Sequence, residues 1–184
     1  MTSDSIYYIT KTLRYALMVV VVLFFVRFFL VEMSVVENRS MEPTLVDNDI
    51  FFVEKISLLF YPPQRGEIMQ LDEPKTHEFL IKRVIGLPGE EVKMDKKGQV
   101  TIVDRAGKVH ELVEPYITPY NFFNSSRAEE TTAKVPPNEY FVLGDNRPNS
   151  TDSRYFGPVH RTLIHGRVVR IGWLNALWQL LASG

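Results

Sequence analysis

Cysteine is absent from this 184-residue sequence, so disulfides and cysteine-ligated metals are excluded and the redox compartment cannot be read. An excess of one charge is also missing, since the formal net charge is -1 and like charges form no run. A nucleic-acid-binding protein needs a basic face, so we expect no nucleic-acid partner. The few histidines lack the spacing of metal ligands, and we expect neither a metal nor another cofactor; they are His77, His110, His160 and His165.

Polar residues are nearly missing from Tyr15 to Val31, which reads YALMVVVVLFFVRFFLV. The run just reaches the ~17 to 25 residues that cross a bilayer. Its one charged residue, Arg27, lies near an end, where the long side chain can reach the headgroups. Lys11 and Arg14 precede the run and acidic residues follow it. The positive-inside rule therefore predicts a cytoplasmic N-terminus, with the chain after Val31 on the far side.

Two other interpretations of this run are weaker. A cleavable signal peptide would end in a small-x-small site, which RFFLVEMSVV does not offer. A buried core helix would rarely carry so many consecutive β-branched and aromatic residues. We therefore predict a single-pass anchor in the cell membrane, with residues 1–34 as cytoplasmic tail and anchor and residues 35–184 as an extracytoplasmic domain.

The domain after the anchor lacks long helical periodicity until its C-terminus. Short β-rich runs recur instead, separated by proline and glycine turn signals; they span 49–56, 66–71, 77–86, 99–104, 139–145 and 166–173. This pattern predicts a mainly β fold, an antiparallel sandwich or barrel, with an inserted hairpin subdomain at about 92–136. Residues 173–181, WLNALWQLL, have helical spacing and predict either a helix that closes the barrel or a patch at the membrane interface.

Lys82 lies inside the predicted strand HEFLIKRVIG. Alternation places Lys82 on one face with Leu80 and Val84, and Arg83 on the other. If the first face is the core, burial lowers the pKa of the amine from its usual ~10.4 and makes Lys82 a general base. The alternative is a lysine at a strand edge whose head group reaches solvent.

Two polar blocks have residue types that could complete a Ser-Lys pair. Ser40 stands in NRSMEPTL, and a serine becomes a nucleophile when a base such as lysine takes its proton. The block GDNRPNSTDSRYFGPV, residues 144–159, is rich in turn formers. This loop either satisfies its own backbone or orients a catalytic amine through a hydroxyl.

SMEPTL, KRVIGLPGE and GDNRPNSTDSRYFGPV, in this order behind one anchor, resemble bacterial type I signal peptidase, and DNDIFFVEK, RGEIM and EPYI support the match. The resemblance implies Ser40 as nucleophile, Lys82 as general base and Ser150 as the hydroxyl that hydrogen-bonds the lysine. It implies the backbone N–H of Ser40 and the side chain of Asn38 as oxyanion donors. Further matched positions are a structural ion pair, Arg83 and Asp145, and two bracing charges, Asp152 and Arg154.

The same resemblance implies small apolar pockets that accept alanine-sized side chains. Val36, Met41, Leu45 and Ile81 match the lining positions, and Phe51 is expected to reach the deeper pocket. The chain departs from the family at Asn38, where Ser or Gly is usual, at Arg39, where Gly is common, and at Pro148, where Asp is usual.

These expectations give a membrane-bound serine endopeptidase that removes signal peptides from exported preproteins after Ala-x-Ala-type sites. Its partners would be the preproteins and the lipid bilayer, and we expect it to act as a monomer. Two other interpretations remain open. One is an inactive, membrane-tethered module that binds export substrates, for which Asn38, Arg39 and Pro148 leave room. The other is a Ser-Lys peptidase specialised for one pilin or conjugation substrate.

Overall fold

The computed structural model describes residues 3–25, 31–117, 130–170 and 172. It divides into two compact units, Met1–Glu32 and Met33–Gly184. The predicted C-terminal helix, residues 173–181, lies outside the described residues.

The first unit is built on helix α1, Ser3–Phe25. Within the described residues it is the one helix long and apolar enough to cross a membrane, with a mean hydropathy of 1.5 over Ile6–Phe24. The predicted span, Tyr15 to Val31, differs from this helix at both ends. Helix α1 begins earlier because polar residues do not interrupt it: the Thr10 hydroxyl, for example, donates to the Tyr7 carbonyl at 2.9 Å. Val31 is already the first residue of a strand.

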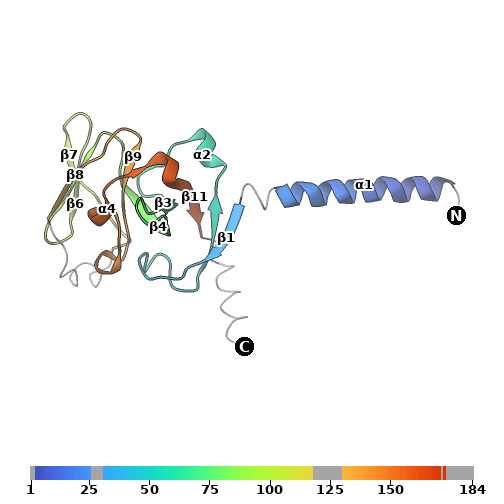
Figure 1. The fold of residues 1–184 in the computed structure, drawn as a ribbon, viewed down its shortest axis with the longest axis horizontal. Coiled ribbons are helices and arrows are strands. Elements are labelled where there is room, and N and C mark those ends of the chain that lie inside the picture. Colours follow the sequence, from blue (N-terminus) through green and yellow to red (C-terminus); the bar gives the residue numbers. More distant parts are fainter. Residues whose placement is uncertain (1–2, 26–30, 118–129, 171, 173–184) are drawn as a thin grey trace. The chain divides into compact units, whose positions relative to one another are not determined.

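The second unit contains a seven-stranded sheet, in which the neighbouring pairs from the second to the seventh strand are antiparallel. In spatial order its strands are β1 (Val31–Val35), β2 (Ile50–Glu54), β11 (Ile164–Val169), β3 (Ile68–Asp72), β4 (Phe79–Gly86), β9 (Glu139–Leu143) and β10 (Val159–His160). The sheet curls, and β4 lies inside it between β3 and β9. Figure 1 shows this arrangement. The longest of these strands therefore carries Lys82 through the middle of the sheet.

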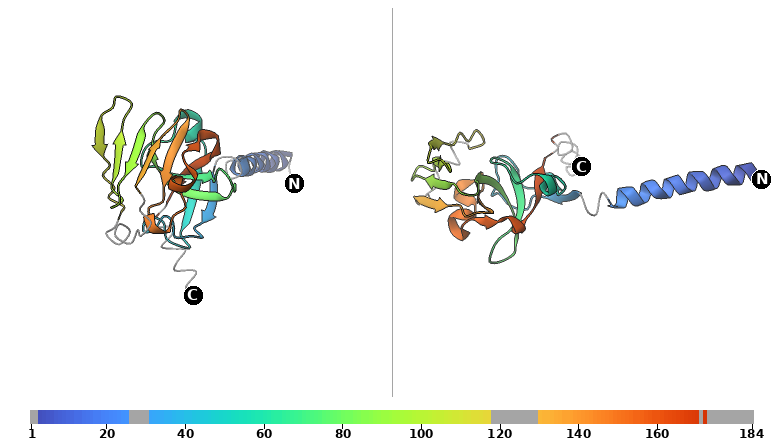
Figure 2. Two further views of the ribbon diagram at one scale, coloured as in Figure 1. Left: turned by 60° about the vertical axis from the view of Figure 1, so that its left-hand side comes forward. Right: turned by 90° about the horizontal axis from the view of Figure 1, so that it is seen from above.

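A second, four-stranded antiparallel sheet follows the order β7-β6-β5-β8. Its strands are β5 (Glu91–Met94), β6 (Val100–Val103), β7 (Val109–Glu111) and β8 (Thr131–Lys134). The views in Figure 2 place this sheet at one end of the unit, beside β9 and away from β1. The described helices of the unit are short: α2 (Ser57–Phe60), η2 (Arg147–Asn149), α4 (Ser153–Phe156) and η3 (Arg161–Leu163). The predicted mainly β, antiparallel fold with an inserted hairpin region is confirmed.

Strand β4 supplies residues to three apolar clusters because its side chains alternate between faces. Val84 packs with residues of β3 and β9, Ile85 packs between the two sheets, and Ile81 packs against the cluster under the Ser40 turn. The two sheets approach closely at Gly86, where an added Cβ would collide with the Val92 side chain. Glycine is therefore required at the point where the sheets meet.

Candidate active site

Ser40 lies in a turn that follows β1 and precedes β2. Two apolar side chains of this turn, Met41 and Leu45, are each 1% exposed and pack with Phe51. The Leu45 N–H also donates to the Met41 carbonyl at 3.0 Å. Packing of Met41 and Leu45 against the core thus fixes the turn and holds Ser40 in place, with its side chain buried.

Lys82 is 1% exposed and pairs with Met69 across β3 and β4. Its Nζ donates to Ser40 Oγ at 2.9 Å and to the Ile81 carbonyl at 2.9 Å. Of the two alternatives that the sequence leaves open for Lys82, the structure shows burial and not a strand-edge position. Lys82 and Ser40 lie in contact although 42 positions separate them.

Burial in the protein interior lowers the pKa of Lys82 to about 8, because the ammonium loses its hydration. The carboxylates of Asp152 and Asp145 oppose this shift, and the Arg154 guanidinium supports it. At pH 7, a pKa of about 8 leaves roughly one amine in ten neutral, whereas an ordinary lysine leaves roughly one in 2,500. The site can therefore supply a base within reach of a serine hydroxyl.

Asn38 contacts Ser40 through its oxygen. Asn38 Oδ1 accepts from the Ser40 N–H at 3.2 Å and from the Ser40 hydroxyl at 2.8 Å. This orientation is the reverse of the donor expected from the resemblance, because the carboxamide presents an acceptor to the atoms that an oxyanion would contact. A donor role for Asn38 with substrate bound stays a prediction.

Ser150 is buried beside Ser40, but the predicted hydrogen bond to Lys82 is not among those of the described residues. The Ser150 Oγ is buried without a partner. Lys82 Nζ donates instead to Ser40 and to the Ile81 carbonyl. Both serines meet at Gly144: an added Cβ there would collide with Ser150 Oγ and with the Ser40 carbonyl oxygen. Glycine at 144 thus permits this close approach, and Ser150 remains within the site as an unsatisfied hydroxyl.

The loop that begins at Gly144 also fixes the backbone of the Ser40 turn. The Asn146 N–H donates to the Ser40 carbonyl at 3.0 Å, and Asn146 Nδ2 donates to the Arg39 carbonyl at 3.0 Å. The Thr44 hydroxyl donates to Asp145 Oδ2. The sequence did not single out Asn146 or Thr44. Their place inside the blocks SMEPTL and GDNRPNSTDSRYFGPV was the one signal that could have identified them.

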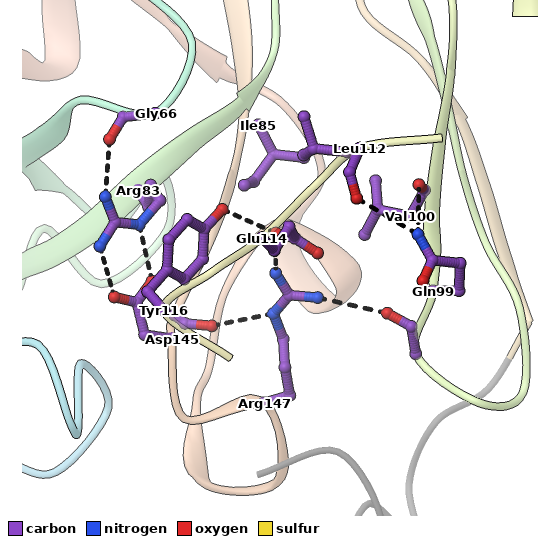
Figure 3. Close-up of polar contacts among 12 residues, drawn as sticks. Gly66, Arg83, Ile85, Gln99, Val100, Leu112, Glu114, Tyr116, Asp145 and Arg147 are labelled. Carbon is purple, nitrogen blue, oxygen red and sulfur yellow. Dashed lines mark hydrogen bonds and ion pairs between the residues drawn. The ribbon is translucent and has the colours of Figure 1, made fainter. Parts of the chain in front are cut away.

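Arg83 and Asp145 form a buried ion pair with two hydrogen bonds, at 2.8 and 2.6 Å. The Arg83 guanidinium also donates to the Gly66 carbonyl at 2.7 Å. Its other face lies on the Tyr116 ring, 3.8 Å from the centroid. Figure 3 shows Arg83 held between Asp145, Gly66 and Tyr116. A two-point ion pair next to Lys82 orients Asp145 and, through it, the Ser40 turn.

A second buried ion pair joins the inserted region to the same loop. Arg147 pairs with Glu114, which also accepts from the Tyr116 hydroxyl at 2.7 Å. Figure 3 shows Arg147, Glu114 and Tyr116 together. Arg147 Nε also donates to the Gly144 carbonyl at 3.1 Å. The residues of EPYI thus contact the loop that carries Ser150, a role that the sequence analysis did not assign.

Asp152 and Arg154 brace the loop from its other end. Asp152 begins helix α4, where its carboxylate accepts from the Arg154 N–H and pairs with the Arg154 side chain at 2.7 Å. Its second oxygen accepts from the Gly144 N–H at 3.0 Å. Arg154 donates to the Arg147 carbonyl at 2.7 Å. The loop from 144 to 152 is therefore closed on itself around Ser150.

The residues predicted to line substrate pockets lie together under the Ser40 turn. Four of them belong to one buried cluster, and Ile81 packs against it; the four are Val36, Met41, Leu45 and Phe51. Because each of the four is less than 5% exposed, little space for a large side chain lies between them. Their contact with substrate stays a prediction.

The chain is similar to several known proteins. A family model described as "Signal peptidase, peptidase S26" matches residues 9–173. A signal peptidase I of Leptolyngbya laminosa is 41% identical over 165 residues, which are 84% of this chain and 75% of the relative. A probable signal peptidase I-2 of Synechocystis is 40% identical over 154 residues, which are 80% of this chain and 66% of the relative. A crystal structure of a signal peptidase I from Enterococcus faecalis matches with a TM-score of 0.50 and 33% identity, covering 59% of this chain and 98% of that one.

Proposed function

The chain belongs to the signal peptidase family, peptidase S26, and on that premise we propose that it is a membrane-anchored serine endopeptidase that cleaves signal peptides from exported preproteins. Ser40 is the nucleophile and Lys82 the general base. One observation carries the assignment to these residues: a buried lysine, with its pKa lowered to about 8, contacts Ser40 Oγ at 2.9 Å.

The chemistry follows from this contact. The neutral amine of Lys82 takes the hydroxyl proton while Ser40 Oγ forms a bond to the scissile carbonyl carbon. The Lys82 ammonium then gives this proton to the leaving amine as the carbon–nitrogen bond breaks. A water molecule attacks the resulting ester with Lys82 again as base, which returns the proton to Ser40. In this cycle the Ser40 N–H stabilises the oxyanion, and loss of one such donor costs ~3 kcal/mol.

The apolar helix α1 supports membrane anchoring. We propose that residues 1–34 form the cytoplasmic tail and anchor, and that residues 35–184 form the extracytoplasmic peptidase domain with the insertion at about 92–136. Lys11 and Arg14, in the N-terminal half of helix α1, support this orientation because basic residues favour the cytoplasmic end of a span. The cluster under Ser40 supports a preference for small side chains at the cleavage site, because its residues are already closely packed. We further propose that the enzyme acts as a monomer.

The test uses the full chain in detergent with a preprotein and with a short Ala-x-Ala peptide. Ser40→Ala and Lys82→Ala each abolish cleavage, while Lys93→Ala, at an exposed lysine, leaves it unchanged. Cleavage retained by either active-site variant would contradict the assignment. A wild-type chain that binds both substrates without cutting them would indicate a binding module, and cleavage confined to one preprotein would indicate a specialised peptidase.

A further inference from the structure

The contact between Asn38 and Ser40 occupies two groups that catalysis needs. Asn38 Oδ1 accepts from the Ser40 N–H at 3.2 Å and from the Ser40 hydroxyl at 2.8 Å. We call this pair of hydrogen bonds the blocking contact. The oxygen must face Ser40, because the Asn38 Nδ2 group would place a donor against the backbone donor of Ser40.

The blocking contact determines how Ser40 and Lys82 share protons. The hydroxyl of Ser40 has one proton, and it points to Asn38 Oδ1. Ser40 Oγ therefore accepts from Lys82 Nζ. Proton abstraction requires the reverse, with the hydroxyl proton directed at the lone pair of a neutral amine. In the free enzyme the base is thus held as a donor, and the backbone N–H meant for the oxyanion is already bonded to an oxygen.

We propose that Asn38 blocks Ser40 in the free enzyme and that the carbonyl oxygen of the scissile peptide displaces the Asn38 oxygen when substrate binds. The proposal rests on the function proposed above and concerns the regulation of the same site. Carboxamide and peptide carbonyl oxygens are both neutral acceptors, so one replaces the other at the Ser40 N–H without a change of charge.

Displacement is sterically and energetically feasible. Asn38 is exposed, and within the described part of the chain its Nδ2 group has no hydrogen-bond partner, so nothing there holds the carboxamide except Ser40. Two neutral hydrogen bonds, each of modest net strength in water, weaken substrate binding by about ten-fold overall. The freed hydroxyl then turns to Lys82.

The blocking contact is also linked to the protonation of Lys82. While it is closed, Lys82 donates to Ser40, and a charged donor forms the stronger hydrogen bond, so the closed state favours the ammonium. Once it opens, the hydroxyl donates to the neutral amine and favours that form. The other charges that act on Lys82 come from Asp152, Asp145 and Arg154, and they belong to a loop that this change leaves in place.

The experiment compares pH profiles of peptide cleavage by the full chain in detergent. The profile of kcat/KM reports the free enzyme and the profile of kcat reports the substrate complex. In the wild type the acidic limb of kcat/KM lies at a higher pH than that of kcat. In Asn38→Ala the two limbs coincide and KM falls about ten-fold. Glu37→Ala, at the exposed neighbouring residue, keeps the wild-type separation, since a change of nearby charge moves both limbs together.

Coincident limbs in the wild type overturn the proposal without any variant, so it remains testable even if Asn38→Ala does not fold. If folded Asn38→Ala keeps the separation between the two acidic limbs, the proposal is also overturned, and the role of Asn38 is only to stabilise the turn. If instead Ser40→Ala or Lys82→Ala still cleaves peptide, the proposed function itself fails. If the Ser40 and Lys82 variants are inactive and the two acidic limbs of the wild type coincide, the proposed function stands. Only the blocking contact is then rejected.

Discussion

Replacing Lys82 with methionine tests how strongly the fold disfavours the buried ammonium. Burial lowers the pKa of Lys82 from 10.5 to about 8. Below pH 8 both the folded and the unfolded chain carry the proton, so the folded state bears the full cost of the buried charge, about 3 kcal/mol. Between pH 8 and 10.5 the unfolded chain binds more protons than the folded one. The free energy of unfolding of the wild type therefore rises with pH in this window.

Methionine removes the charge at similar length, but it also removes two hydrogen bonds, to Ser40 Oγ and to the Ile81 carbonyl. At about 1 kcal/mol each, they offset about 2 kcal/mol of the gain. Lys82→Met is thus more stable than the wild type by about 1 kcal/mol at pH 7. At pH 9.5 the charge contributes only about 1 kcal/mol, so the same variant is less stable by about 1 kcal/mol.

The assay is thermal unfolding of the full chain in detergent, followed by circular dichroism of the β-sheet signal at pH 7 and pH 9.5. A difference of 1 kcal/mol corresponds to a shift of roughly 2 to 4 °C for a unit of this size. Lys93→Met, at an exposed lysine, serves as control and stays within about 0.5 kcal/mol of the wild type at both pH values. A Lys82→Met difference that does not change with pH would refute the claim that the ammonium is destabilised by burial.

Three further substitutions test how the active-site loop is held. Gly144→Ala is expected to lose most of its cleavage activity and about 1 to 3 kcal/mol of stability, because the added methyl group overpacks the site. The control Gly172→Ala, with open space around the residue, is expected to change neither activity nor stability. Equal melting temperatures for the two variants would contradict this. Asp145→Asn weakens the buried ion pair with Arg83, and denaturant titration is expected to show a free energy of unfolding lower by about 3 to 5 kcal/mol. A loss under about 1 kcal/mol would show that the pair is dispensable. Asn146→Ala, which loses the bond to the Arg39 carbonyl, lowers kcat more than it raises KM, and steady-state kinetics showing the opposite would place Asn146 in substrate binding.

The sequence predicted the strand that carries Lys82 because alternation in a strand is a local property. Residues 77–86 were expected to be extended, and β4 spans Phe79–Gly86. Whether Lys82 is buried could not be decided from the strand alone, because the apolar neighbours Leu80 and Val84 fit both a core face and a strand edge. Short strands such as β8, which reads TTAK, were missed, because their identity comes from pairing with β5 and not from their own composition.

The orientation of Asn38 could not be predicted for a different reason. A carboxamide has one donor and one acceptor end of similar shape, so its residue type does not say which end faces a neighbour. The Ser40 N–H is a donor, so the oxygen of the Asn38 carboxamide faces it. The roles of Asn146 and Glu114 depend on contacts with residues 107 and 33 positions away, and no local pattern announces such contacts.

The central claim is that Lys82 acts as a neutral base on Ser40, and the dependence of kcat/KM on pH tests it most directly. The acidic limb for an Ala-x-Ala peptide is expected at a pKa of about 8, which is the value for Lys82 in the free enzyme. A limb near ~6.5, typical of histidine, or near ~10.4, typical of an exposed lysine, would contradict the account.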